Sequence, residues 1–332
     1  MSLLNGRKVS IAGTGMYVPE KILTNSDLSK IVDTSDEWIV ERTGIRERHI
    51  AAEDEMTSDL AYKASLSALK NSGIKAEDLD MIIVATNTPD TVFPGVAPKV
   101  QGMLQAVKAG ANDIQAGCTS CIYAMAIASA GISSGLWDNV LVVGAEVLSR
   151  VLNWEDRNTC VLFGDGAGAV VLNSSRQGMG TVISCELRAD GTKHDYITLP
   201  AGLIERPASE STIAEGLHYV HMKGNDVFKF VNRILPSFLN KACTDSGIAS
   251  DEIDWWIFHQ ANLRIMQGVL KRLKVSEEKA VVNLQNYGNT SAASTLIALH
   301  EAFNDGRIQN NHNVLLTSFG AGMTYGVLIF QT

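Results

Sequence analysis

The sequence predicts a layered α/β fold built from two duplicated halves. Residues 71–85 align without gaps with residues 245–259, a shift of 174 residues, and residues 139–143 align with residues 313–317 at the same shift. Each half reads as strand, helix, strand, a helix of small residues, strand, and a glycine-rich turn into another strand. Alternating elements of this kind form layered α/β domains. We therefore expect halves at residues 1–175 and 176–332, with the two small-residue helices packed centrally.

The composition indicates a compact cytoplasmic protein. Of its 332 residues, 45% are hydrophobic and 19% are charged, which fits a large buried interior. The net charge of −8 argues against nucleic acid as the main partner, although an acidic partner could still meet a local basic patch. Five cysteines without a disulfide pattern suit a reducing compartment. The sequence contains no apolar run near the roughly 20 residues that span a bilayer, no signal peptide and no metal-ligand spacing.

The first half begins with a strand predicted at residues 8–13. Residues 57–71 carry apolar side chains at helical spacing and end before Gly73, and residues 79–85 form an apolar run typical of a buried strand. Two glycine-rich stretches, at residues 13–15 and 164–169, do not fit a dinucleotide-binding loop. Pro19 follows the first too closely for the required helix, and the second leads into a strand.

The small-residue helix of the first half begins near Cys118, just after Gly117. The first amide groups of a helix lack internal partners, and the partial positive charge there stabilises a thiolate. A small buried core residue is the alternative, since most intracellular cysteines are of that kind. A central helix that presents one cysteine at its tip favours a nucleophile.

A polar stretch at residues 32–48 surrounds Trp38. Residues 34–36 can cap a short helix that carries Trp38 and Arg42 on one face, four residues apart. An aromatic ring beside a guanidinium suits a nucleotide base and its phosphate. A surface helix with a half-buried tryptophan is the alternative interpretation.

The second half supplies two polar residues at positions equivalent to the surroundings of Cys118. His259 lies at the end of a predicted strand, and Asn289 comes just before the second small-residue helix. A lone histidine at a strand end is usually structural. A pseudo-twofold axis would, however, bring the tips of both central helices together, so we expect Cys118, His259 and Asn289 to converge.

Four motifs distributed over the chain are distinctive as a set. They are residues 33–48, Phe-Gly-Asp-Gly-Ala-Gly at 163–168, His-Gln-Ala-Asn-Leu-Arg at 259–264 and Gly-Asn-Thr-Ser-Ala-Ala-Ser at 288–294. With them the chain resembles, over essentially its whole length, the β-ketoacyl-acyl-carrier-protein synthase III family. The resemblance implies a thiolase-like, five-layered αβαβα fold, a homodimer, and a catalytic triad of Cys118, His259 and Asn289.

The activity that the resemblance implies is a decarboxylative Claisen condensation that initiates fatty acid synthesis. Cys118 would take the acyl group from a short acyl-CoA, and the backbone N–H groups of Cys118 and Ala321 would form the oxyanion hole. His259 and Asn289 would then stabilise the enolate formed when malonyl-acyl carrier protein loses CO₂. No metal and no redox cofactor are required. A condensing enzyme of secondary metabolism with a different acyl donor or acceptor is the alternative.

The resemblance also assigns substrate-binding residues. It places the coenzyme A adenine on Trp38, with Arg157 on the other side of the adenine, and the nucleotide phosphates near Arg42. Phe93 would cross the dimer interface and close the acyl pocket of the neighbouring subunit. The other residues that the resemblance assigns to substrate binding are Asn225, Phe228, Ala261, Asn262 and Phe319.

A basic helical face is predicted to dock the acyl carrier protein. Arg264, Lys271 and Arg272 share one face of a helix whose other face carries an apolar stripe. With Lys229 they match the docking patch that the resemblance implies, which would reconcile an acidic enzyme with an acidic partner. A merely solvated basic face is the alternative.

Departures from the family pattern fall close to the predicted acyl pocket. Ala321 stands in a turn that is usually all glycine, and Met323 and Tyr325 stand where another apolar residue and a tryptophan are usual. Cys121 follows the nucleophile by three residues, and we expect it either to line the pocket or to form a regulatory disulfide with Cys118. A dithiol redox protein is a further alternative, although the thioredoxin-like context is missing. The polar loop at 201–217 has no readable role.

Overall fold

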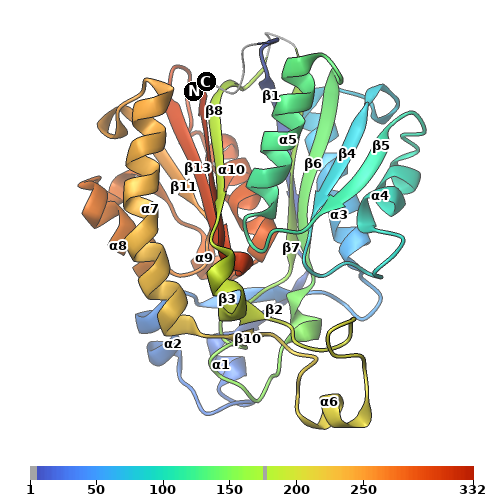
Figure 1. The fold of residues 1–332 in the computed structure, drawn as a ribbon, viewed down its shortest axis with the longest axis vertical. Helices are drawn as coiled ribbons and strands as arrows, with labels where there is room; N and C mark the ends of the chain where they lie inside the picture. Colours follow the sequence, from blue (N-terminus) through green and yellow to red (C-terminus); the bar gives the residue numbers. More distant parts are fainter. Residues whose placement is uncertain (1–5, 175–177) are drawn as a thin grey trace.

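The structure, a computed structural model, describes residues 6–174 and 178–332. A ten-stranded mixed sheet runs through them in the order β12-β11-β13-β14-β8-β1-β7-β6-β4-β5 (Figure 1). The strands of the first half are β1 (Ser10–Tyr17), β4 (Met81–Ala85), β5 (Gly110–Ile114), β6 (Asn139–Glu146) and β7 (Gly166–Asn173). Those of the second half are β8 (Gly180–Ala189), β11 (Trp255–Phe258), β12 (Ala280–Val281), β13 (Asn313–Gly320) and β14 (Thr324–Gln331).

The two halves of the sheet have the same strand order. From the outer edge inward, the first half runs β5-β4-β6-β7-β1, and the second half runs β12-β11-β13-β14-β8, which is the same succession when each half is counted along the chain. The halves join through the antiparallel pairs Ser10–Thr181 and Ile11–Gly180 of β1 and β8. The predicted boundary between residues 175 and 176 lies outside the described residues and stays a prediction.

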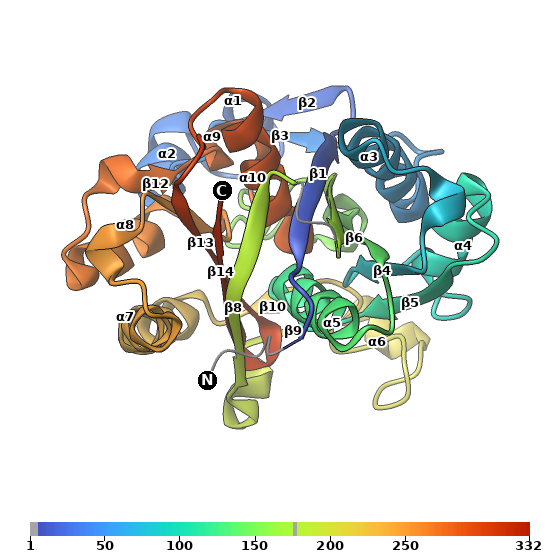
Figure 2. The same cartoon turned by 90° about the horizontal axis from the view of Figure 1, so that it is seen from above.

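Helices and sheet halves alternate in five layers (Figure 2). The central layer consists of α5 (Ser120–Ser134) and α10 (Ser294–Asn304), each of which contacts strands of both halves. The outer helices are α3 (Thr57–Ser72) and α4 (Val96–Leu104) on the first half, and α7 (Gly224–Ser246) with α8 (Leu263–Leu273) on the second. This arrangement confirms the predicted layered α/β fold with two central small-residue helices.

Two glycines allow α10 to lie close to the sheet of the first half. A Cβ atom added to Gly144 of β6 would lie 2.3 Å from the carbonyl oxygen of Ala292, and one added to Gly168 of β7 would lie 2.7 Å from the nitrogen of Ile297. Because Cβ atoms do not approach other atoms so closely, only glycine fits at these positions. The contact places the residues that precede α10 beside the end of β6, where the pocket described below begins.

Shorter elements gather at the end of the molecule to which the N-terminus of α5 points (Figure 1). β2 (Lys21–Thr24) pairs with β3 (Glu47–Ile50), and β9 (Ile197–Thr198) pairs with β10 (His221–Met222). β1 continues to Tyr17, beyond its predicted end, because it pairs with β7 along that length. The short α-helices are α1 (Asn25–Leu28), α2 (Asp36–Thr43), α6 (Glu210–Ala214) and α9 (Leu284–Tyr287). The 3₁₀ helices are Ala76–Asp78, Leu148–Val151, Gly191–Tyr196, Ser250–Glu252, Glu277–Lys279, Ser291–Ala293 and Ala321–Met323.

Within the described part of the chain, one helical stretch, Gly117–Ser134, has the length and apolar composition of a membrane span. It contains the central helix α5, and 72% of it is buried inside the protein. Packing between the two halves of the ten-stranded sheet accounts for its apolar character.

Candidate active site

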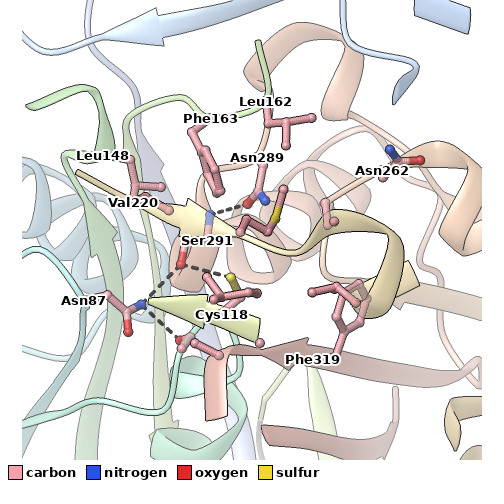
Figure 3. A pocket seen from close by; sticks show the side chains of 18 of the residues that line it. Asn87, Cys118, Leu148, Leu162, Phe163, Val220, Asn262, Asn289, Ser291 and Phe319 are labelled. Carbon is pink, nitrogen blue, oxygen red and sulfur yellow. Dashed lines mark hydrogen bonds between the residues drawn. The ribbon is translucent and has the colours of Figure 1, made fainter. Parts of the chain in front are cut away.

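A pocket of about 900 Å³ opens where the tips of α5 and α10 meet. Cys118, His259 and Asn289 all line it, so the structure brings the predicted triad together at one place. Figure 3 shows Cys118 and Asn289 around Ser291, with Phe319 farther along the wall. The predicted substrate-binding residues that line the same pocket are Trp38, Arg42, Arg157, Asn225, Phe228, Ala261, Asn262 and Phe319.

Cys118 lies in the turn just before Thr119, the N-cap residue of α5. It is partly exposed, whereas the other four cysteines of the chain are buried. Burial of its sulfur raises the pKa of the thiol to about 12; the hydroxyl of Ser291 acts in the opposite direction, and the nearby carboxyl of Glu146 adds to the increase. The sequence predicted a stabilised thiolate at this helix tip. Desolvation of the sulfur thus opposes the helix-tip effect, whereas the hydroxyl of Ser291 supports it, so the thiolate stays a prediction.

His259 follows β11 directly, and its backbone N–H donates to the carbonyl oxygen of Thr317 on β13 at 2.7 Å. Its Nδ1 lies 2.6 Å from the hydroxyl oxygen of Ser294 at the start of α10. The ring packs edge-on against Phe319, with 5.3 Å between centroids. Burial lowers the pKa of His259 to about 3, so the imidazole is neutral around pH 7.

Three hydrogen bonds fix the backbone and side chain of Asn289. Its backbone N–H donates to the carbonyl oxygen of Leu162 at 2.8 Å, and its carbonyl oxygen accepts from the N–H of Gly164 at 3.1 Å. The side-chain Oδ1 accepts from the backbone N–H of Ser291 at 2.8 Å. Because the amide oxygen is occupied in this way, the Nδ2 group is the part of the side chain that remains for a ligand.

Residues 117–118 pack closely against residues 320–321, which brings the backbone nitrogens of Cys118 and Ala321 together. A Cβ atom on Gly320 would lie 2.2 Å from the nitrogen of Cys118, and one on Gly117 would lie 2.4 Å from the nitrogen of Ala321. Ala321 does not belong to the residues with positive φ, so its side chain causes no left-handed strain. The alanine therefore keeps the backbone N–H that the predicted oxyanion hole requires.

The outer end of the pocket carries an aromatic ring with two cations. Ser35 caps α2 by accepting from the N–H of Trp38, which presents the indole at the rim. The guanidinium carbons of Arg42 and Arg157 lie 4.8 Å and 5.0 Å from the ring centroid. Trp38 and Arg42 thus share one helical face, as predicted.

Asn262 has a structural task in addition to lining the pocket. Its Oδ1 caps α8 by accepting from the N–H of Arg264 at 2.9 Å, and its Nδ2 donates to the carbonyl oxygen of Arg42 at 3.0 Å. The residue therefore connects the end of α2 to the beginning of α8.

Several predicted site residues lie outside the pocket. Phe93 is 85% exposed on the surface. Lys229 and Lys271 are also exposed, and Arg272 donates to the carbonyl oxygen of Asn232, which ties α8 to α7. Arg264 is exposed and lines the pocket rim, so the four basic residues extend from the rim onto the outer helices.

The sequence-based prediction missed two polar residues on the pocket wall, Asn87 and Ser291, and an apolar region beside them. Ser291 lies inside the 288–294 motif, which could have drawn attention to it, whereas Asn87 follows a strand without any distinguishing pattern. The apolar lining comes from Leu148, Val151, Leu162, Phe163, Leu199, Leu203 and Val220. Leu203 belongs to the loop at 201–217, which therefore contributes to the pocket wall.

Three of the residues expected to shape the acyl pocket do not line it. Cys121 is fully buried in the core around α5, so the expectation that it forms pocket wall is wrong. Met323 and Tyr325 pack into the core on the α7 side, where the Tyr325 ring meets Phe238 edge-on at 4.9 Å. Thr324 between them faces the pocket instead, because successive strand residues point to opposite faces.

Comparisons with known proteins agree with this site. The family models of 3-oxoacyl-[acyl-carrier-protein (ACP)] synthase III and of its C-terminal region match residues 112–191 and 243–332. A β-ketoacyl-[acyl-carrier-protein] synthase III of Caldanaerobacter subterraneus subsp. tengcongensis is 51% identical over 97% of both chains. One of Symbiobacterium thermophilum is 48% identical over 98% of both chains.

The crystal structure of 3-oxoacyl-[acyl-carrier-protein] synthase III from Aquifex aeolicus superposes with a TM-score of 0.90. It is 42% identical, and the match covers 98% of this chain and 100% of that one. These similarities confirm the predicted thiolase-like fold class and the prediction of a condensing acyltransferase. The chain belongs to the β-ketoacyl-[acyl-carrier-protein] synthase III family.

Proposed function

We propose that this pocket condenses a short acyl-CoA primer with malonyl-acyl carrier protein and releases a β-ketoacyl-acyl carrier protein, which initiates fatty acid synthesis. The supporting observation is the convergence of Cys118, His259 and Asn289 on one pocket that also carries Trp38 with the guanidinium groups of Arg42 and Arg157 close to its ring. The names of relatives about half identical to this chain favour this reaction over a condensation in secondary metabolism.

In the first half-reaction, Cys118 receives the acyl group. The sulfur loses its proton and forms a bond to the thioester carbon, while the carbonyl electrons move to oxygen beside the N–H groups of Cys118 and Ala321. When the tetrahedral adduct collapses, the bond to coenzyme A breaks and the coenzyme leaves as its thiol. The adenine would stack at Trp38 near Arg157, the phosphates would meet Arg42, and the pantetheine would pass Asn225, Phe228, Ala261 and Asn262.

In the second half-reaction, His259 and Asn289 act on the malonyl thioester. The bond to the carboxylate breaks, CO₂ departs, and the electron pair passes onto the thioester oxygen as an enolate. A neutral imidazole Nε2–H and the Asn289 Nδ2–H group can both donate to that oxygen. The carbanion then attacks the acyl carbon, and Cys118 sulfur is released. Donation from Nε2 requires Nδ1 to be the accepting nitrogen, in which case the hydroxyl of Ser294 gives its one hydrogen to Nδ1 and not to the carbonyl oxygen of Ser291, 3.0 Å away.

The apolar part of the wall suits the acyl chain of the primer. Leu148, Leu162 and Phe163 form a continuous apolar surface near Cys118 (Figure 3). Burying such a chain there removes apolar surface from water, at about 25 cal/mol for each Å². The primer is therefore an acyl group without charge.

The remaining assignments concern partners and location. The acyl carrier protein would dock on Lys229, Arg264, Lys271 and Arg272 through its acidic surface. A second copy of the chain would complete the site by placing its Phe93 at the acyl pocket. The reaction as written needs no metal or redox cofactor, and the enzyme would act in the cytoplasm.

Variants of the triad test this proposal by separating the two half-reactions. With acetyl-CoA alone, Cys118→Ala should lose the acyl adduct that wild-type protein shows by intact mass. His259→Ala and Asn289→Ala should still acylate but lose release of CO₂ from malonyl-acyl carrier protein by at least a hundredfold, because the enolate oxygen loses a donor. Condensation at a near-wild-type rate in either of the last two variants would refute the assigned roles.

A further inference from the structure

A carboxyl group without a cationic partner is buried directly beneath the nucleophile. Glu146, the last residue of β6, is fully buried. It accepts from Asn87 Nδ2 at 2.6 Å, from the Thr88 hydroxyl at 2.6 Å and from the Asn87 backbone N–H at 3.1 Å. Within the described residues, no Lys, Arg or His side chain forms a hydrogen bond or ion pair with it. Burying a carboxyl without a cationic partner costs stability, and this one holds Asn87, a residue of the pocket wall.

The first consequence of Glu146 is that the amide of Asn87 has a single possible orientation. Asn87 Nδ2 lies 2.6 Å from Glu146 Oε1 and 3.1 Å from the carbonyl oxygen of Gly117, and the latter oxygen can only accept. The nitrogen must therefore face both, and it lies 3.2 Å from the hydroxyl oxygen of Ser291. This nitrogen has two hydrogens, which the two shorter contacts take, so toward Ser291 it can share a hydrogen but cannot accept one.

The second consequence is the direction of the Ser291 hydroxyl. Because the Asn87 nitrogen cannot accept from it, the one hydrogen of Ser291 must find another acceptor, and the sulfur of Cys118 lies 3.3 Å away (Figure 3). Burial raises the pKa of Glu146, and the nearby hydroxyl of Ser291 opposes that increase. The hydrogen bond that the Ser291 hydroxyl donates runs to the Cys118 sulfur, whereas the shortest bonds that the Glu146 carboxyl oxygens accept come from Asn87 and Thr88.

The backbone of Ser291 shows that this position is constrained. Its φ of +48° is in the left-handed region, which costs a non-glycine residue energy that the surrounding contacts must offset. The same residue donates its backbone N–H to Asn289 Oδ1 and its hydroxyl to Cys118 sulfur. A strained residue that contacts two members of the triad is typical of a functional position.

We infer that Ser291 is a positioning residue that donates a hydrogen bond to the sulfur of Cys118 and stabilises its thiolate, and that Glu146 acts through Asn87 to keep this hydroxyl directed at sulfur. This inference rests on the proposed role of Cys118. Ser291 transfers no proton: during acylation the proton of Cys118 leaves with coenzyme A, and the hydroxyl only donates to the sulfur while it is negative. The groups that titrate around Cys118 are Glu146, His259 and Cys121.

The test is the rate at which iodoacetamide alkylates Cys118 between pH 6 and 10, followed by intact mass and peptide mapping. Loss of the donor in Ser291→Ala should slow alkylation at pH 7 about tenfold and move the midpoint of the profile to higher pH, since hydrogen bonds to charged groups are strong. Ser291→Gly also removes the left-handed strain, and alkylation of Cys118 in this variant should be equally slow. That result would show that the hydroxyl, and not the backbone conformation, is responsible.

Two further measurements separate this role from a structural one. Thr290→Val removes a neighbouring buried hydroxyl whose oxygen has no hydrogen-bond partner among the described residues, and it should leave the alkylation profile unchanged. Release of CO₂ from malonyl-acyl carrier protein should persist in Ser291→Ala, because the backbone N–H that holds Asn289 remains.

The outcomes distinguish the inference from the proposed function. An unchanged alkylation profile in Ser291→Ala, or equal losses of alkylation and decarboxylation, overturns the role of Ser291. If acetyl-CoA acylates the wild-type enzyme at a residue other than Cys118, the proposed function itself fails.

Discussion

His259 lies in surroundings that keep its imidazole neutral. Burial lowers its pKa to about 3, whereas in the unfolded chain an exposed histidine has its usual pKa near 6.5. At pH values between these two pKa values, the histidine binds a proton in the unfolded chain but not in the folded protein. The stability that depends on this residue is therefore present above about pH 6.5 and decreases as the pH falls toward the folded pKa.

This linkage predicts how His259→Gln changes acid stability. Between pH 7 and pH 5, wild-type protein should lose about 2 kcal/mol more unfolding free energy than the variant, which has no imidazole to protonate. Urea unfolding at the two pH values measures the difference. His221→Gln is the control, because His221 is exposed. Parallel losses in wild type and His259→Gln would contradict the depressed pKa.

At the scale of single elements, α8 has two roles. Its buried residues Ile265, Met266, Val269 and Leu270 pack into the core of the second half. Its exposed face carries Arg264 and Lys271, and neither has a carboxylate partner among the ion pairs of the described residues. An unpaired basic face at a pocket rim suits an acidic partner protein.

Charge reversal on α8 tests the docking surface. Lys271→Glu should raise the KM for malonyl-acyl carrier protein about three- to tenfold and leave acylation by acetyl-CoA unchanged, because the acyl-CoA does not reach that residue. The increase should shrink as salt is added, since exposed charges are screened over about 8 Å at physiological ionic strength. Steady-state kinetics of both half-reactions measure the effect.

A matched control sharpens that experiment. Lys75→Glu makes the same charge change at an exposed lysine of the first half, far along the chain from α8. It should leave both half-reactions unchanged. An equal increase in KM from Lys75→Glu would mean that net charge, and not the α8 surface, governs the encounter.

At the scale of the whole molecule, the first half presents an exposed apolar segment at the edge of the sheet. Val92 and Phe93 are 68% and 85% exposed, and β5 is the outermost strand on that side. Exposed apolar side chains beside an unpaired strand edge are typical of an interface between subunits.

We predict that Phe93→Asp converts a homodimer into a monomer and lowers condensation. The carboxylate would have to be buried without a partner in the interface, which costs several kcal/mol. Sedimentation velocity measures the mass, and Leu136→Asp is the control because Leu136 is another exposed apolar residue, at 68%, on a different surface. A monomeric wild-type protein, or a dimer that persists in Phe93→Asp, would contradict the predicted interface.

Sequence patterns identified most residues of the site but not the contacts among them. The 288–294 motif indicated Asn289, and strand-end position indicated His259. Asn87 and Ser291 are in contact although they are 204 residues apart in the sequence, and no local sequence pattern predicts a contact between such distant residues. Cys121 and Tyr325 were expected near the acyl group, but helix phase and strand alternation direct them into the core.

Duplication, periodicity and the four motifs were enough to determine the layered fold and the central small-residue helices, and they predicted that Cys118, His259 and Asn289 converge on one pocket. These properties depend on which residues occur and at what spacing, and both can be read directly from the sequence. The ionisation of Cys118 and His259 depends on solvent exclusion and on neighbours from both halves, so only the tertiary structure decided it. Desolvation of the Cys118 sulfur opposes the helix-end effect that the sequence indicates, and the extent of that desolvation depends on packing that no local pattern reports.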